Sequence, residues 1–375
     1  MSRRSLRFPA LVGNEFRKPF HRASTYVMFG MTLLLCVLGI LFSFLQQTFS
    51  TPETGSGVKM TDKEILTQRI QADQLTLDQQ RATLKALEET GAYPDSFNPD
   101  GGAVPTLEPA LLKMELDGMR LSISMTEKDL ALAQYRYDHG MPAEDGATAL
   151  GYAAGQGWIV QLLTLFAIVL MSIGVASEFT GGTIRLLLTR PFRRWKILLS
   201  KYLGVYAIIL CMLAGTVVMA LLGGVLLHGF TSSPYLTYAN GTVQAVPMIL
   251  FVLAQFGLAC ISLLLFSTMA FMVASVFRTS ALSIGLSLFL MFLGTTVTSL
   301  IYALGTMIDS GILKGIVRFS MFSYTDLTPY VFGTTTGLYL LPTDASLGFA
   351  VAVLAVYYLL FLAVAFFGFS KRDIA

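Results

Sequence analysis

Six long runs of uncharged residues decide what this chain can fold into. Each run contains no Asp, Glu, Lys or Arg and is long enough to cross a hydrocarbon layer of about 30 Å as a helix. The runs are Thr25–Leu45, Trp158–Ala176, Tyr202–Leu227, Val246–Phe277, Thr279–Ile308 and Leu347–Phe369. A mean hydropathy of +0.65 and a charged fraction of 13% agree with this pattern. The sequence therefore predicts an all-α polytopic membrane protein with six transmembrane helices.

The first run is expected to remain as a membrane span. It is longer than the apolar region of a cleavable signal peptide, and no small-residue cleavage site follows it in the stretch "SFLQQTFSTPE".

The distribution of charge predicts the orientation in the membrane. Residues 51–151 hold 17 of the 23 acidic residues and 9 of the 26 basic ones, so this segment is negative and the remainder positive. Basic residues close to span ends favour the cytoplasmic side. They occur in the N-terminus, the 177–201 loop, Arg278 and the C-terminal tail, which alternate correctly for six spans. We therefore expect a multi-pass protein of the cell (plasma or inner) membrane with both termini cytoplasmic.

The acidic segment between the first two spans has two heptad patterns separated by a loop rich in Gly, Pro and Asn. The apolar heptad positions are Leu66, Ile70, Leu77, Leu84 and Leu87, then Leu112, Leu116, Met119, Ile123, Leu130 and Tyr137, with Asp73, Gln80, Thr126 and Ala133 as interruptions. This spacing is typical of two packed helices. We expect an extracytoplasmic helical hairpin that acts as a stalk or cap, in preference to a catalytic domain.

The predicted organisation divides the chain into seven parts. They are 1–24, a cytoplasmic N-terminus with an amphipathic helix; 25–45, span 1; 46–157, the extracytoplasmic hairpin domain; 158–176, span 2; 177–201, a cytoplasmic loop; 202–369, spans 3 to 6; and 370–375, a cytoplasmic tail. The helix in 1–24 is expected to lie in the membrane interface, because its apolar residues recur at helical spacing among basic ones. The alternative is an ordinary basic flank that fixes the topology.

No motif for catalysis is present. The chain has no phosphate-binding loop, no H-E-x-x-H, no G-x-S-x-G and no C-x-x-C. Its three cysteines lie inside predicted spans, its three histidines are scattered, and the spans contain no acidic residues. We therefore expect no enzyme activity in this chain, no catalytic residue, no cofactor or metal site, and no nucleic-acid partner.

The loop at 177–201 contains the most informative local pattern. Glu178 falls at the end of the second span, where the helix dipole disfavours a negative charge, so it either pairs with a cation or is simply solvated. Gly181 and Gly182 can end that helix, Thr183 can cap a new one, and Pro191 ends it. The result would be a short amphipathic helix that another protein could push.

At this point the sequence resembles a known family. The stretch "EFTGGTIRLLLTRPFRRWKILLSK" resembles the signature that follows the second span in type-2 ABC exporter permeases. The matching residues are Glu178, Gly182, Thr183, Arg185, Pro191, Arg193 and Lys201. Before the first span, Asn14, Glu15 and Lys18 resemble the N-terminal elbow helix of that family, and "FSKRDIA" resembles its usual ending. Residues 51–151 lie outside the resemblance.

The resemblance implies the function and partners of the chain. The 177–201 loop would contain a coupling helix seated on a separate ABC ATP-binding subunit, which would bind ATP and Mg. Two permeases, identical or different, would form the transporter in the lipid membrane. Because the spans contain few charges, we expect an apolar or amphipathic cargo, such as a peptide antibiotic, a drug or a lipid. The alternative is an ABC-coupled sensor or mechanotransmitter that acts through its external domain without moving cargo.

Five polar residues within the predicted spans are candidates for lining the transport pathway. They are Gln161, Gln255, Thr295, Thr296 and Thr298. Hydrogen bonding between helices is the interpretation that we favour for them, because polar residues in membrane helices commonly bond across helix contacts.

Overall fold

The computed structural model describes residues 13, 23–49, 60–92, 108–143, 148–180, 194–230, 233–239, 241–308, 310–332 and 345–371. Within these ranges, six helices are long and apolar enough to cross a membrane. They are α2 (Ala23–Phe49), α6 (Trp158–Thr180), α8 (Arg194–His228), α9 (Met248–Phe277), α10 (Ser280–Met307) and α13 (Leu347–Lys371). The predicted fold class, an all-α polytopic membrane protein with six spans, is therefore confirmed.

Four of these helices begin at positions that differ from the sequence-based prediction, and for α8 and α9 the sequence explains the difference. α8 starts at Arg194, eight residues before the predicted Tyr202, because the intervening Trp, Lys, Leu and Ile residues contain no helix breaker. α9 starts at Met248, after Pro247, because proline lacks the amide hydrogen that a preceding turn would use. Val246, the predicted start of this span, is instead the last residue of a β-strand.

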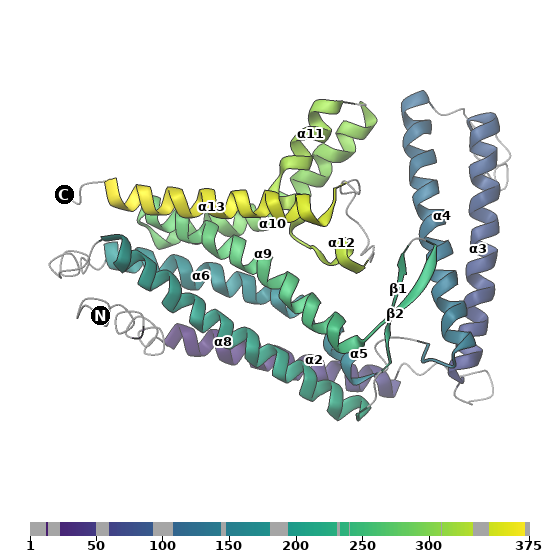
Figure 1. The fold of residues 1–375 in the computed structure, drawn as a ribbon, viewed down its shortest axis with the longest axis horizontal. Helices are drawn as coiled ribbons and strands as arrows, with labels where there is room; N and C mark the ends of the chain where they lie inside the picture. The colour runs from purple at the N-terminus through teal and green to yellow at the C-terminus, as the bar shows by residue number, and fades with distance from the viewer. Residues whose placement is uncertain are drawn as a thin grey trace.

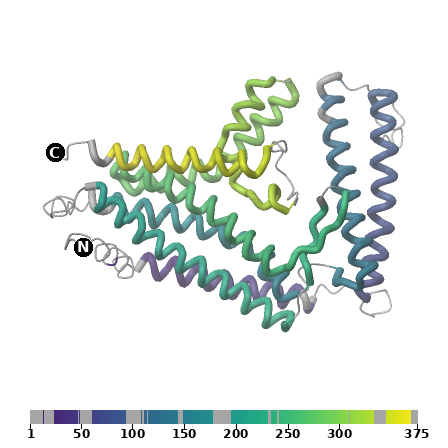
Figure 2. Tube along the Cα trace, viewed as in Figure 1, coloured from purple at the N-terminus to yellow at the C-terminus, as the bar shows by residue number. Residues whose placement is uncertain are grey.

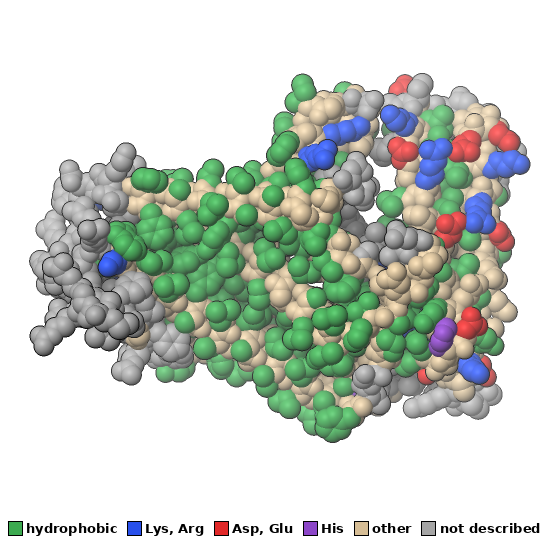
Figure 3. Space-filling model, in the orientation of Figure 1, with side chains coloured by type: hydrophobic (Ala, Val, Ile, Leu, Met, Phe, Trp, Pro, Cys, Tyr) green, Lys and Arg blue, Asp and Glu red, His purple; other side chains and the backbone are tan. Residues whose placement is uncertain are grey.

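The helix bundle is packed around α6, and its outer helices are largely uncovered. In the most apolar stretch of α6, 61% of the residues are buried, against 11% in α2 and 17% in α10. A single main core joins α6, α8, α9 and α13 (Figure 1). The face of the bundle in Figure 3 is covered by hydrophobic side chains, whereas charged side chains gather on α3, α4 and α11. Apolar surface of this extent suits contact with lipid.

Helices α3 (Asp62–Thr90) and α4 (Pro109–Asp138) lie side by side and antiparallel beyond one end of the bundle (Figures 1 and 2). Arg81 pairs with Glu127 at 2.7 Å and Arg120 pairs with Glu88 at 2.9 Å. These four side chains are all partly exposed to water, so the pairs set the helix register more than they stabilise the fold.

A polar layer joins the two helices at Gln80. Its Nε2 donates to Ser122 Oγ at 2.8 Å, and its Oε1 accepts from Thr126 Oγ1 at 3.0 Å. Thr61 caps the start of α3 in a reciprocal bond pair with Glu64, and Gly91 ends the helix with a φ of 66°. The Thr61 amide holds the pKa of the Glu64 carboxyl below its ordinary value.

The contact between α3 and α4 follows the heptad pattern with one exception. Leu66, Leu77 and Leu87 are buried, but the side chain of Tyr137 is 41% exposed. Arg136 is buried in its place, and its Nη1 donates to the carbonyl oxygen of Pro142 at 3.0 Å. The chain reverses direction here, so the last heptad position no longer faces α3.

Several short elements were not expected from the sequence. They are α5 (Ala149–Gly155), the antiparallel strands β1 (Tyr235–Ala239) and β2 (Thr242–Val246), α11 (Gly311–Phe319), the 3-10 helix η3 (Met321–Tyr324) and α12 (Thr328–Phe332). Tyr235 pairs with Val246 and Ala239 pairs with Thr242 in the strand register. Both strands contact α4, so they connect the α3–α4 pair to the bundle.

Candidate functional site

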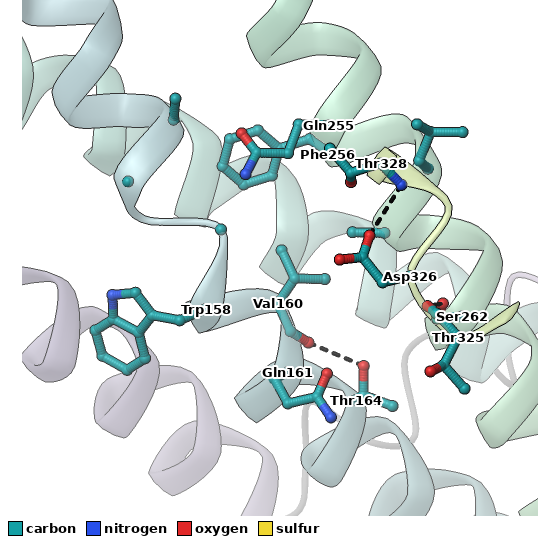
Figure 4. A pocket seen from close by; sticks show the side chains of 15 residues that line it. Trp158, Val160, Gln161, Thr164, Gln255, Phe256, Ser262, Thr325, Asp326 and Thr328 are labelled. Atoms are coloured by element: carbon teal, nitrogen blue, oxygen red, sulfur yellow. Dashed lines mark hydrogen bonds between the residues drawn. The ribbon is translucent and has the colours of Figure 1, made fainter. Parts of the chain in front are cut away.

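A cavity of about 390 Å³ lies between the first turns of α6, the first half of α9 and the segment that joins η3 to α12 (Figure 4). Its polar lining residues are Gln161, Thr164, Gln255, Ser262, Thr325, Asp326 and Thr328, and its larger apolar ones are Trp158, Val160, Phe256 and Leu258. The volume lies within the range of small-molecule sites.

The junction of α5 and α6 places Gly157 against the side chain of Gln255. α5 ends at Gly155 with Gln156 as its C-cap, and α6 begins at Trp158, so Gly157 lies in the turn between them. A Cβ atom on Gly157 would come within 2.8 Å of Gln255 Nε2. Glycine at this position therefore gives the side chain of Gln255 room to lie against the start of α6. Gln255 Oε1 is buried, and none of the described residues donates a hydrogen bond to it.

The segment between η3 and α12 is held in place by hydrogen bonds at both of its ends. Asp326 Oδ1 accepts from the backbone amide of Thr328 at 2.9 Å, which fixes the start of α12. Ser262 Oγ of α9 donates to the carbonyl oxygen of Thr325. Asp326 is exposed and is the only charged side chain among the described residues that line the cavity. The cavity wall therefore carries a net negative charge.

The remaining polar groups of the wall come from α6. Thr164 Oγ1 donates to the carbonyl oxygen of Val160 at 2.9 Å, while Gln161 lies beside it (Figure 4). Trp158 stands at the start of the helix with 52% of its side chain exposed. Polar acceptors, one carboxylate and apolar rings thus share one cavity, an arrangement suited to binding an amphiphile. Among the described residues, no three His, Cys, Asp or Glu side chains are grouped to hold a metal.

The five polar residues singled out in the spans divide into two groups. Gln161 and Gln255 line the cavity. Thr295, Thr296 and Thr298 do not, because they lie on α10, away from the cavity wall. Thr298 donates to the carbonyl oxygen of Gly294 at 2.7 Å and Thr296 to that of Phe292 at 3.3 Å, and both bonds lie within α10. The contact of Thr298 with Ser320 Oγ at 3.3 Å reaches another segment, as the interpretation of bonding between helices predicts.

Sequence reasoning missed Asp326 and its neighbours. Asp326 lies in a segment assigned to a loop, where an acidic residue is unremarkable. A usable signal was present nevertheless, since "DLTP" places an Asp shortly before Thr-Pro, a pattern typical of a helix start.

A second polar cluster joins three spans further along the bundle. Tyr202 Oη of α8 lies 2.9 Å from Thr268 Oγ1 of α9 and 3.1 Å from Tyr358 Oη of α13. Tyr206 donates to the carbonyl oxygen of Leu264 at 2.8 Å. Hydrogen bonds of this kind hold membrane helices in a defined register. The cluster therefore ties α8 to the two helices behind it.

The structure describes only part of the predicted coupling region, residues 177–201. Lys201 lies in α8, seven residues after its first residue, and its side chain is 7% exposed. Glu178 belongs to the last turn of α6. The other matching residues, Gly182, Thr183, Arg185, Pro191 and Arg193, lie outside the described residues, as do Asn14, Glu15 and Lys18 of the predicted elbow helix. Their roles stay predictions.

Taken together, the fold and the cavity define a helical, multi-pass membrane protein with a ligand-sized amphipathic cavity. The chain belongs to the family described as "Protein of unknown function (DUF2705)", which matches residues 119–375.

Two relatives from Bacillus subtilis (strain 168) are similar to it. "Uncharacterized protein YhcI" is 32% identical over 369 residues, which cover 97% of this chain and 99% of that protein. "Uncharacterized membrane protein YdbK" is 25% identical over 225 residues, which cover 60% of this chain and 83% of that protein. The name of the second relative agrees with the membrane fold.

Proposed function

We propose that this chain is the permease subunit of an ATP-driven ABC exporter that moves an apolar or amphipathic cargo outward. The observation that carries the proposal is the sequence of 177–201, in which Glu178, Gly182, Thr183 and Pro191 follow the pattern of type-2 ABC permeases. This segment extends from the last turn of α6 into the first turns of α8, and both are apolar helices of membrane-spanning length. ATP hydrolysis is assigned to a separate subunit, because no phosphate-binding loop occurs in the sequence.

The proposed orientation follows the basic residues. Arg194 and Lys196 lie at the end of α8 that follows the 177–201 segment, and the basic tail follows α13. This end of the bundle faces the cytoplasm in our proposal. The α3–α4 pair then stands outside the membrane, and the cavity occupies the half of the bundle nearer to it. An amphipathic cavity in that half suits the release of cargo outward.

The proposed mechanism is a change between two packed arrangements of the spans. ATP binding would close the partner subunits and displace the 177–201 segment between α6 and α8. Trp158, Gln161 and Thr164 occupy the opposite end of α6, where they line the cavity. A tilt of α6 would therefore change the cavity shape, and with it the affinity for cargo.

The test is coupling to the ATP-binding subunit, identified by mass spectrometry of copurified proteins. Glu178→Ala and Arg185→Ala are expected to weaken the pull-down of that subunit or to lower its permease-dependent ATP turnover several-fold. Arg81→Ala, which removes an exposed cation from α3, is the matched control and should leave both unchanged. Unchanged coupling in both 177–201 variants, or failure of any ATPase to copurify, would count against the proposal.

One observation favours a second candidate, an ABC-coupled sensor. Strands β1 and β2 connect α8 to α9 and also contact α4, so a force on the α3–α4 pair would reach the spans directly. Replacing residues 60–140 by a short linker distinguishes the transporter from the sensor. Export that survives the deletion supports the transporter. Loss of an ATPase-dependent signal, with no cargo moved by the full chain, supports the sensor.

A further inference from the structure

We propose that the cavity recognises a cationic amphiphile, with a primary ammonium group bound at Asp326 and an apolar body held among Trp158, Val160 and Phe256. This inference names the class of cargo, and in that respect it rests on the proposed function. Its chemistry is that of an alkyl or aralkyl amine, a lipid amine or the amino group of an apolar peptide.

The charge of the cavity is the first argument. Asp326 forms no ion pair with any of the described residues, and no Lys or Arg among them is part of the cavity wall. An anionic ligand would be repelled, and a neutral one would leave the carboxylate without a counterion. A cation would be attracted to the carboxylate, and because Asp326 is exposed, water screens part of that attraction.

The hydrogen-bonding groups are the second argument. An ammonium group has three N–H donors and no acceptor, so it needs several oxygen atoms. Asp326 uses Oδ1 for the amide of Thr328, and none of the described residues donates to its Oδ2. Gln161 and Thr325 belong to the same wall, and the side-chain oxygen of each can accept a hydrogen bond. A quaternary ammonium, which has no N–H, could use none of these acceptors, so the primary amine fits better.

The apolar part of the wall is the third argument. Val160, Phe256 and Leu258 supply hydrocarbon surface beside the polar groups, and the ring of Trp158 stands at one side (Figure 4). A small inorganic cation would leave this surface in contact with water. A cation attached to a hydrocarbon body would cover it, and the removal of this apolar surface from water would favour binding.

The two tryptophans of the chain make a direct binding test possible. Trp158 lines the cavity, whereas Trp195 lies at the start of α8, at the opposite end of the bundle. The variant Trp195→Phe therefore has a single tryptophan, which lies at the site. It is reconstituted in nanodiscs of zwitterionic lipid, without any ATPase subunit, and titrated with 4-phenylbutylammonium or with its neutral analogue 4-phenylbutanol.

We expect a saturable change of Trp158 emission with the ammonium and about tenfold weaker binding of the alcohol, the effect of losing one charge-assisted hydrogen bond. Asp326→Asn in the same background retains the oxygen that accepts from Thr328, so α12 should stay in place. It should weaken ammonium binding about tenfold and leave alcohol binding unchanged. The control Asp78→Asn removes an exposed charge on α3 and should change neither.

Three results would overturn the inference: equal affinity for the ammonium and the alcohol, undiminished ammonium binding in Asp326→Asn, or no saturable signal with the ammonium. Because binding is measured without the partner, this outcome is separable from the ATPase test. Ammonium binding without ATPase coupling would leave the cavity assignment standing and remove the exporter proposal. ATPase coupling without selective ammonium binding would leave the exporter proposal standing and remove the cavity assignment.

Discussion

At the scale of single residues, two glycines lie where a neighbouring segment packs very closely against a membrane-spanning helix. At one of them the neighbour is the backbone of α5, and at the other it is an aromatic ring of η3. A Cβ on Gly224 of α8 would lie 2.1 Å from the carbonyl oxygen of Ala149 in α5. A Cβ on Gly294 of α10 would lie 2.2 Å from the ring of Phe322. Both distances are too short for any real contact. The chain therefore uses glycine where α5 and η3 dock against membrane helices.

The contact at Gly224 gives a test of the packing. Gly224→Ala should destabilise the fold by about 1–3 kcal/mol, because the clash is with backbone, which cannot rotate away as a side chain can. Gly257→Ala is the matched control, since it also lies inside a span and a Cβ there would have no atom within 4 Å. Thermal unfolding of the purified protein measures both. Equal melting temperatures for the two variants would contradict the close approach of α5 to α8.

The cavity shows how far single residues could be predicted. Gln161 and Gln255 stand out in the sequence because amides are rare in apolar spans, and both line the cavity. Asp326 did not stand out, since its position beside α9 depends on how η3 and α12 pack. The sequence pattern reports which residues are unusual for their segment. Contacts between segments far apart in the chain depend on tertiary packing, which one sequence does not display.

At the scale of elements, periodicity predicted the long helices well and the short ones poorly. The heptads of α3 and α4 place Gln80 and Thr126 on the contact surface, where they bond to each other. Strands β1 and β2 have only five residues each, too few for a clear alternation. Their signal was the Asn-Gly pair at 240–241, a frequent hairpin turn, which went unused in a segment interpreted as a loop.

Asp73 gives the α3–α4 pair a dependence on pH. Partial burial raises the pKa of this carboxyl, Arg69 opposes the shift, and Asp129 adds to it. The folded state therefore holds this proton more tightly than the unfolded state does. Stability is lost as the pH rises through the raised pKa, and the loss is absent below the ordinary value.

Asp73→Asn should remove this dependence and stabilise α3 at neutral pH by up to about 1 kcal/mol, since water still reaches part of the side chain. Hydrogen exchange of α3 in the full chain, compared between variant and parent from about pH 4 to about pH 7, measures the effect. Asp78→Asn, which removes a carboxylate at an exposed position on the same helix, is the control. A difference of equal size in both variants would refute the role of burial.

At the scale of the whole molecule, hydropathy was sufficient to place all six spans. The five predicted starts other than that of α8 fall within two residues of the observed helices or their apolar segments. Orientation is a separate matter, since it depends on the positions of Lys and Arg relative to a membrane.

The orientation can be measured by labelling single cysteines from one side of intact cells. After replacement of Cys36, Cys211 and Cys260, Asp78→Cys should react with a membrane-impermeant maleimide, because α3 lies outside in our proposal. Arg372→Cys should react only after the membrane is permeabilised. The opposite pattern would invert the topology, and labelling of both positions in intact cells would contradict the five spans predicted between them, since it requires an even number there.

The length of α8 has a mechanical consequence. Its 35 residues extend over about 52 Å, well beyond the roughly 30 Å of a hydrocarbon layer. One end directly follows residue 193, and near the other end Gly224 touches α5, whose Ala154 and Gly155 belong to the cavity wall. A single covalent helix thus extends from the segment between α6 and α8 to a neighbour of the cavity. If the first turn of α8 moves, the helix moves as one rigid body and displaces α5 directly. No series of side-chain rearrangements between the two ends is needed.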